Sequence, residues 1–257
     1  LAEAIDKSLI EVESKAREGK AEPEDLFYLL NDSPFTGWVK EIRSNGHQID
    51  ALGKIKDGKL IGFAEWHLNG KISYQSNFKN GKKHGVQTYW HENEQKACLE
   101  NYKNGKEHGI QTYWHENGQK SKIENYKDGV EDGLEIHYLE DGRECFRRTY
   151  KDGLQEGLSA DWYSNGQKEY ERNYKEGKRD GLETKWYQNG QKKSESNYKN
   201  DILISAVVWK PNGEKCPLTN IIDGNGVFLN YNNDGTEHFR SIYKNSEILE
   251  THNPNFP

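Results

Sequence analysis

The histidines come closest to a metal-binding pattern in this sequence. His84 and His108 are 24 residues apart, and so are His91 and His115. If the 24-residue units stack as paired strands, equivalent side chains lie about 10 Å apart, and two histidines could share a metal ion. The first series does not continue as histidine, because later units carry acidic residues there: Asp132, Glu156 and Asp180. We therefore interpret these positions as a solvated polar face.

Other catalytic patterns are equally weak. Acidic pairs such as Glu131-Asp132 could act in general acid–base chemistry, but no feature of the sequence sets their separation. The sequence contains neither a nucleophile elbow nor a phosphate-binding glycine loop. The cysteines, Cys98, Cys145 and Cys216, lack the spacing of metal ligands, and we expect free thiols. The sequence therefore predicts a non-enzymatic protein without a cofactor or metal.

A row of large aromatic residues is the strongest candidate for a functional surface. These residues recur at one position of successive units and are Trp66, Trp90, Trp114, Tyr138, Trp162, Trp186 and Trp209. One interpretation is a packing ladder, in which each ring covers its neighbour and stabilises the sheet. The other is a binding face, because Trp and Tyr dominate the energetics of protein interfaces. The sequence does not decide between packing and binding.

The spacing of these residues comes from an internal repeat. Lead glycines occur every 24 residues, and we expect them to allow backbone angles that a Cβ would resist; they are Gly85, Gly109, Gly133, Gly157 and Gly181. An aliphatic residue follows each lead glycine by one position and the aromatic residue by five. An Asn-Gly or Asp-Gly pair follows in most units, and a Tyr stands 17 residues after the glycine.

Each unit therefore reads as one β-hairpin. Asn-Gly between alternating segments favours a type I′ turn, in which both central residues have positive φ. The aliphatic and aromatic positions share parity, so we expect them on one face of the sheet, joined by the Tyr across the hairpin. The first Asn-Gly pair of the repeat is interrupted at Asn93-Glu94. Looser copies on both sides bring the total to about nine hairpins.

The predicted fold is all-β, an elongated single-layer antiparallel sheet of about nine repeats of roughly 24 residues. Residues 1–20 show helical spacing of Leu1, Ile5, Leu9 and Val12 and predict a short N-terminal helix that covers the first sheet edge. A linker to a removed anchor is the alternative. Residues 26–30 read as a strand, with a short helix as alternative. We expect a cap over residues 1–34, the repeat domain over 35–250 and a tail over 251–257.

Composition fits a thin sheet. Hydrophobic residues make up only 32% of the chain, which is too little for a thick core, but 7 Trp, 15 Tyr and 8 Phe argue against disorder. The net charge of −6 is unfavourable for nucleic acid and for anionic lipid. The chain begins at Leu1 and contains no Met, so we expect that a start segment was removed. This favours an exported or cell-envelope location over the cytoplasm.

The repeat skeleton resembles the MORN repeat variant. The matching motifs are Gly-aliphatic, Trp-Tyr-x-Asn-Gly-Gln-Lys and Tyr-Lys-x-Gly-Lys-x-x-Gly, over about residues 33–250. Ser33-Pro34-Phe35-Thr36-Gly37 is similar to the lead-in of proteins identified as YwqK-type antitoxins of toxin–antitoxin systems. The resemblance implies a grooved sheet for protein contacts, sometimes for lipid contacts or self-association. Tyr138, Glu94 and the irregular unit at 205–225 depart from the pattern.

The leading functional hypothesis is a non-catalytic scaffold that binds a protein, and the resemblance implies that the partner is a toxin. The alternative is an envelope carbohydrate-binding module whose Trp and Tyr rings stack on sugars. A third hypothesis, an accessory domain of an enzyme, requires a longer native protein. Self-association is a further outcome of the repeat sheet, whereas nucleic acid and membrane lipid are not expected partners.

Overall fold

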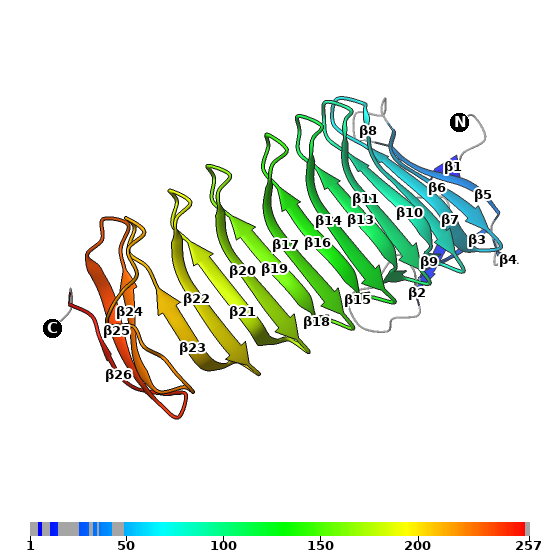
Figure 1. Cartoon of the computed structure of the whole chain (residues 1–257). Coiled ribbons are helices and arrows are strands. Elements are labelled where there is room, and N and C mark those ends of the chain that lie inside the picture. The colour runs from blue at the N-terminus through cyan, green and yellow to red at the C-terminus, as the bar shows by residue number, and fades with distance from the viewer. Residues whose placement is uncertain are drawn as a thin grey trace. The chain divides into compact units, whose positions relative to one another are not determined.

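The structure is a computed structural model that describes residues 5–6, 11–14, 26–30, 33–34, 36–42 and 49–254. These residues form strands, bridges and turns, and no helix occurs among them. The chain divides into two compact units, residues 1–130 and 131–257. Within each unit the hairpins lie side by side in one antiparallel layer (Figure 1). The predicted all-β hairpin sheet is therefore confirmed in both units.

In the first unit, a main sheet carries the hairpins and a small three-stranded sheet is formed by β2, β3 and β4. The strands are β1 (Ile5–Asp6), β2 (Glu11–Ser14), β3 (Leu26–Leu30), β4 (Ser33–Pro34), β5 (Gly37–Ile42), β6 (Ile49–Lys56), β7 (Lys59–Trp66), β8 (Ile72–Lys79), β9 (Lys82–Lys83), β10 (Gly85–Trp90), β11 (Lys96–Lys103), β12 (Lys106–Glu107), β13 (Gly109–Trp114) and β14 (Lys120–Lys127). Strand β15 (Val130–Glu131) lies at the boundary of the units.

In the second unit, hairpins of the main sheet are followed by a separate three-stranded sheet of β24, β25 and β26. The strands are β16 (Gly133–Tyr138), β17 (Glu144–Lys151), β18 (Leu154–Gln155), β19 (Gly157–Trp162), β20 (Lys168–Lys175), β21 (Lys178–Trp186), β22 (Lys192–Lys199), β23 (Ile202–Val208), β24 (Gly226–Tyr231), β25 (Glu237–Lys244) and β26 (Glu247–His252).

The hairpins of both units share one register. In β10–β11, Gly85 pairs with Tyr102 and Tyr89 with Cys98, and in β19–β20 Gly157 pairs with Tyr174. Each register shifts just before the aromatic residue that ends the first strand, as between Tyr89 and Trp90. This shift is a β-bulge, which places one extra residue in the returning strand.

The bulge corrects one prediction. The Tyr 17 residues after the lead glycine does not join the aliphatic and Trp positions, because Tyr102 lies directly opposite Gly85. Paired residues share a face, and Val86 and Trp90 point to the other side. Residues 90–97 lie between the partners Tyr89 and Cys98. The paired residues Tyr89 and Cys98 therefore differ by an odd number of positions yet share a face. Simple alternation along the sequence would put residues an odd number apart on opposite faces.

The two turns of each unit also differ from the prediction. At the Asn-Gly pair Asn117-Gly118 only the glycine has positive φ, and its N–H bonds to the carbonyl of His115. This is the three-residue loop with a left-handed bulge residue, not a type I′ turn. The type I′ signature lies at the second turn, where Asn104 and Gly105 have φ of 54° and 83°. Lys103 pairs with Lys106, so the loop between them has two residues, and a loop of this length favours the type I′ conformation.

The predicted helix over residues 1–20 falls mostly outside the described residues. Where that stretch is described, β1 and β2 are strands, so the helix prediction is wrong there. Ile5 pairs in parallel with Val39 of β5, and β2 pairs antiparallel with β3. The alternation Glu11-Val12-Glu13 also fits a two-residue period, which the helical interpretation overlooked. The strand predicted over 26–30 is confirmed as β3.

The regular ladder is interrupted after β23. Residues 209–225 form a turn and isolated bridges instead of a full return strand. The hairpin from Gly226 belongs to a separate sheet and packs on the end of the ladder. Val208, Cys216, Leu229 and Tyr231 form a small buried cluster there. A second cluster lies beside it and consists of Leu203, Ala206 and Ile221.

Candidate binding faces of the repeat sheet

The alternation of side chains defines two faces in each unit. We call the first the Trp face; it carries the residues one, three and five positions after each lead glycine, as in Val86, Thr88 and Trp90. The opposite side is the Tyr face, with the residues two, four and 17 positions after it, as in Gln87, Tyr89 and Tyr102. The two faces have different chemistry.

The predicted aromatic residues occupy one position on the Trp face. They end the first strand of each hairpin, or directly follow β23 in the case of Trp209. All are half-buried: Trp66, Trp90 and Trp114 in the first unit, and Tyr138, Trp162, Trp186 and Trp209 in the second. Each pairs with the residue that opens the returning strand, as Trp90 does with Lys96 and Trp186 with Lys192.

Lysine side chains cover part of this row. Nζ of Lys168 lies 5.4 Å from the ring centre of Trp186, and Nζ of Lys192 lies 5.8 Å from that of Trp209. Both lysines come from the preceding hairpin, and each also forms an ion pair with a glutamate, Glu171 and Glu195 respectively. The cation–π contacts join neighbouring hairpins and shield ring faces that a sugar would need for stacking.

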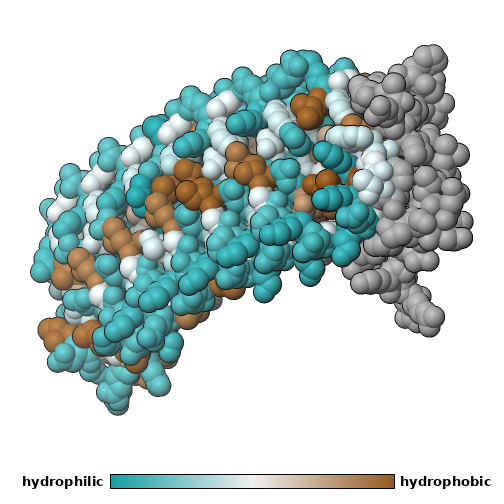
Figure 2. Space-filling model, turned by 90° about the vertical axis from the view of Figure 1, so that its right-hand side faces the viewer, coloured by the Kyte–Doolittle hydropathy of each residue, from teal (hydrophilic) through white to brown (hydrophobic). Residues whose placement is uncertain are grey.

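The aliphatic residues after the lead glycines are among the exposed apolar side chains of the Trp face. Val86 and Ile110 are 39% and 53% exposed in the first unit, and Leu158 and Leu182 are 43% and 45% exposed in the second. Figure 2 shows hydrophobic side chains at the surface of the sheet, bordered by hydrophilic ones. Contiguous exposed apolar patches on soluble proteins can mark interaction sites, so this row is a candidate binding surface.

In several repeats a polar residue after the aromatic residue connects one hairpin to the next, whereas Leu139 follows Tyr138. Nε2 of His67 lies 2.8 Å from the carbonyl oxygen of Trp90. In the second unit the hydroxyl of Tyr163 donates to the carbonyl of Trp186, also at 2.8 Å. His67 and Tyr163 thus fill one structural role, because each reaches the backbone of the following hairpin.

The turn asparagines make a second connection. Oδ1 of Asn165 accepts the N–H of Gln167 in its own turn, while its amide nitrogen donates to the carbonyl of Gln188 in the next hairpin, 2.7 Å away. Asn93 does the same with Gln95 and Glu116. An amide supplies both an acceptor and a donor, which explains Asn at this position better than a type I′ turn does.

The Tyr face carries a row of buried polar residues. Gln87 and Gln111 are fully buried, and the amide of Gln111 donates to the carbonyl of Asn101, 3.0 Å away. Gln87 makes the equivalent bond to Asn77. These side chains hydrogen-bond backbone groups between hairpins. This row was not predicted from the sequence, although Gln at the same place in two units was a signal for it.

Aromatic rings and charged groups crowd the Tyr face of the first unit. The rings of Tyr74 and Tyr89 stack 4.5 Å apart, and Nζ of Lys122 lies 4.4 Å from the ring centre of Tyr113. Burial raises the pKa of the Cys98 thiol to about 12, and the nearby carboxylate of Glu100 adds to the increase. Cys98 is therefore a neutral thiol among the side chains of the Tyr face.

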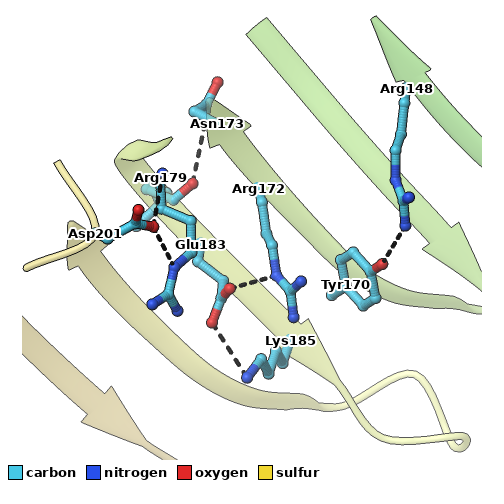
Figure 3. Close-up of polar contacts among 9 residues, drawn as sticks. Arg148, Tyr170, Arg172, Asn173, Arg179, Glu183, Lys185 and Asp201 are labelled. Atoms are coloured by element: carbon cyan, nitrogen blue, oxygen red, sulfur yellow. Dashed lines mark hydrogen bonds and ion pairs between the residues drawn. The ribbon is translucent and has the colours of Figure 1, made fainter. Parts of the chain in front are cut away.

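In the second unit the same face carries arginines (Figure 3). Glu183 is 2% exposed and forms ion pairs with Arg172 and Lys185, which both point toward it. Nη2 of Arg148 in β17 lies 3.4 Å from the hydroxyl of Tyr170 in β20, a strand of the next hairpin. Replacing one partner of the Glu183 cluster would leave a buried charge unpaired, which is strongly destabilising.

The histidine series has a structural role in the first unit. Nδ1 of His84 and Nδ1 of His108 accept the backbone N–H of Asn104 and Asp128, each at 3.4 Å. In the second unit, Glu156 accepts the N–H of Glu176 in the same way. His, Asp and Glu all supply an acceptor, which accounts for their exchange at this position. Across the described part of the chain, no group of three or more His, Cys, Asp and Glu is placed to hold a metal ion.

Comparison with known protein families agrees with this architecture. The family described as MORN repeat variant matches residues 63–80, 83–104, 107–128, 155–176 and 179–200. The unit around β16 and β17 is not matched, yet it has the same register and bulge as the others. No curated protein matches the chain. MORN repeats are scaffold motifs for protein or membrane interaction. No helix of the described residues is long and apolar enough to cross a membrane.

Proposed function

We propose that the chain is a non-catalytic scaffold that binds a partner protein on its Trp face. The observation that carries this proposal is the row of exposed aliphatic side chains on a single-layer sheet, represented by Val86 and Ile110 in the first unit. A sheet face normally buries its apolar side chains against another layer. Here these side chains remain in solvent, and a partner would remove them from water.

The aromatic row has a packing role in this proposal. Trp186 and Trp209 lie under lysines of the preceding hairpins, and the backbone carbonyls of both accept hydrogen bonds from Tyr hydroxyls. The rings thus hold neighbouring hairpins in register, and the aliphatic residues beside them contact the partner. This arrangement favours a protein partner over a carbohydrate, because sugar stacking needs open ring faces.

A pull-down from native lysate tests the scaffold proposal. The wild-type chain should capture a reproducible protein partner, and the variant Val86→Asp/Ile110→Asp should lose it. Glu92→Lys/Glu116→Lys is a control for altered surface charge, because both residues are exposed in hairpin turns. Circular dichroism should show an unchanged sheet in all variants. Capture that survives the aspartate substitutions would place binding elsewhere.

A narrower proposal makes the partner a toxin, and its support is the resemblance of the repeat skeleton and lead-in to YwqK-type antitoxins. Co-expression with the product of an adjacent gene tests it. A toxic neighbour whose effect this chain suppresses would support the antitoxin function. Suppression that needs Val86 and Ile110 would link it to the Trp face. A neighbour that is harmless when expressed alone would argue against it.

A further inference from the structure

The second turns of the first unit form an edge rich in lysine. Strands β6 and β7, β8 and β9, and β11 and β12 are joined by two-residue turns at the same end of the antiparallel ladder. We define the lysine edge as the six exposed lysines that flank these turns: Lys56, Lys59, Lys79, Lys82, Lys103 and Lys106. The net charge of −6 over the whole chain does not reveal this concentration of lysine.

The lysines face each other in pairs. Lys56 lies opposite Lys59, Lys79 opposite Lys82, and Lys103 opposite Lys106 in the strand register. Like charges directly opposite on paired strands are destabilising. Such a pair recurs in three successive hairpins, so repulsion between the lysines destabilises the isolated chain. An anionic partner would relieve this repulsion.

Few acidic groups offset this charge. Asp57 is the acidic residue within the three turns, and its carboxylate and N–H face Thr36. No ion pair of the six lysines is found among the residues that the structure describes. The next turn ends the series, because Asp128 follows Lys127 and Val130 takes the place of the second lysine. The edge is therefore bounded within the first unit.

The spacing of the edge indicates the shape of its partner. Neighbouring hairpins are two strand spacings apart, so successive lysine pairs lie about 10 Å apart. A polyproline II segment repeats every three residues with a rise of about 3.1 Å per residue, or about 9 Å per turn. An acidic residue at every third position of such a segment would meet each lysine pair in turn.

We propose that the lysine edge docks an extended acidic segment of the partner protein, with a carboxylate at every third residue. This inference rests on the proposed scaffold function and names the chemistry of the partner. A protein segment fits better than an anionic membrane, because the turn tips, such as Asn80-Gly81 and Asn104-Gly105, carry no apolar side chain to insert into lipid.

Fluorescence anisotropy with the full chain in 50 mM NaCl tests the proposal. The probe is a labelled 12-residue peptide with Glu at every third position and Pro elsewhere, and the same peptide with Gln for Glu is its control. The Glu peptide should bind and the Gln peptide should not. Raising NaCl to 300 mM should weaken binding, because exposed ion pairs are screened by salt.

Matched variants locate the site. Lys59→Gln/Lys82→Gln/Lys106→Gln should weaken peptide binding about tenfold, on the basis of three exposed charge contacts. Lys151→Gln/Lys175→Gln/Lys244→Gln removes the same charge from second turns of the other unit and should change binding less than about twofold. Equal losses in both variants would mean non-specific attraction and overturn the proposal.

Two further results separate this proposal from others. Phosphatidylserine vesicles that bind the chain through the same lysines, while the Glu peptide does not, would assign the edge to lipid and overturn it. The lysine-edge variant should also weaken capture of the partner in the lysate pull-down. Full capture by this variant, together with loss in Val86→Asp/Ile110→Asp, would refute the edge and leave the scaffold function intact.

Discussion

The hydroxyl of Tyr187 donates a hydrogen bond to the backbone carbonyl oxygen of Trp209, 2.8 Å away. Tyr187 is 2% exposed, so this bond is made in the interior of the second unit. The bond joins the turn after β21 to the end of β23 and thus connects one repeat to the next. The equivalent residue in the preceding hairpin, Tyr163, makes the same bond to Trp186. These bonds hold successive repeats together at the Trp positions.

Tyr187→Phe should lower the free energy of unfolding by about 1–2 kcal/mol, because the Trp209 carbonyl loses its buried donor. Tyr163→Phe removes the same bond at a half-buried position and should cost less. Urea unfolding followed by circular dichroism measures both. Equal stability of Tyr187→Phe and the wild type would show that the bond contributes no net stability.

Asn165→Asp should cost about 1 kcal/mol, because the carboxylate keeps the acceptor for Gln167 N–H but loses the donor to the Gln188 carbonyl. Asn165→Ala removes both bonds and should cost more. Chemical denaturation at neutral pH compares the two. If the alanine variant is as stable as the aspartate variant, the bond within the turn contributes nothing.

Glu94→Gly should stabilise the chain by about 1 kcal/mol. Glu94 has a φ of 69°, a left-handed conformation that costs a residue with a Cβ about 1–2 kcal/mol. Its ion pair with Lys71 is exposed and offsets little of this. Gly118→Ala at the equivalent position should destabilise the chain by a similar amount. Thermal or urea unfolding of the pair would reveal these opposite signs, and shifts in the same direction would contradict this explanation.

Stability should fall at alkaline pH. Burial raises the pKa of both Tyr187 and Tyr198 to about 12, whereas a tyrosine in the unfolded chain ionises near pH 10. The unfolded state therefore loses protons first, so this stabilisation is complete below about pH 10 and declines toward about pH 12. Urea titrations at pH 8, 10 and 11 should show the decline. Tyr187→Phe/Tyr198→Phe should make the decline shallower without abolishing it, because burial also raises the pKa of tyrosines such as Tyr89. An unchanged slope would assign the effect to those other groups.

The repeat period predicted the hairpins because glycine spacing and alternation act locally along the chain. The two faces were harder to predict, because one bulge residue such as Ala97 reverses the parity between Tyr102 and Trp90. The type I′ turn was predicted at the wrong one of the two turns for a similar reason. Asn117-Gly118 and Asn104-Gly105 are both strong turn signals, but the number of loop residues decides their geometry. The residue types alone do not predict how many residues each loop contains.

The aromatic row was found from the sequence, whereas its contacts were not. The lysines over Trp186 and Trp209 come from other hairpins and follow from the strand register. The lysine edge follows from register in the same way, since the opposition of Lys103 and Lys106 depends on a two-residue turn. Charge counted over the whole chain averages such local concentrations away.

The side-chain bonds between regular hairpins join each one to its immediate neighbour, as Asn93 to Glu116 and Asn165 to Gln188. Each lead glycine recurs after 24 residues, so deleting 85–108 would put Gly109 directly after His84, where Gly85 stands now. The hairpins on either side of the deletion would then contact residues equivalent to those that they contact now. Gene duplication or loss of one such segment can therefore lengthen or shorten the protein during evolution without redesign of the remaining repeats.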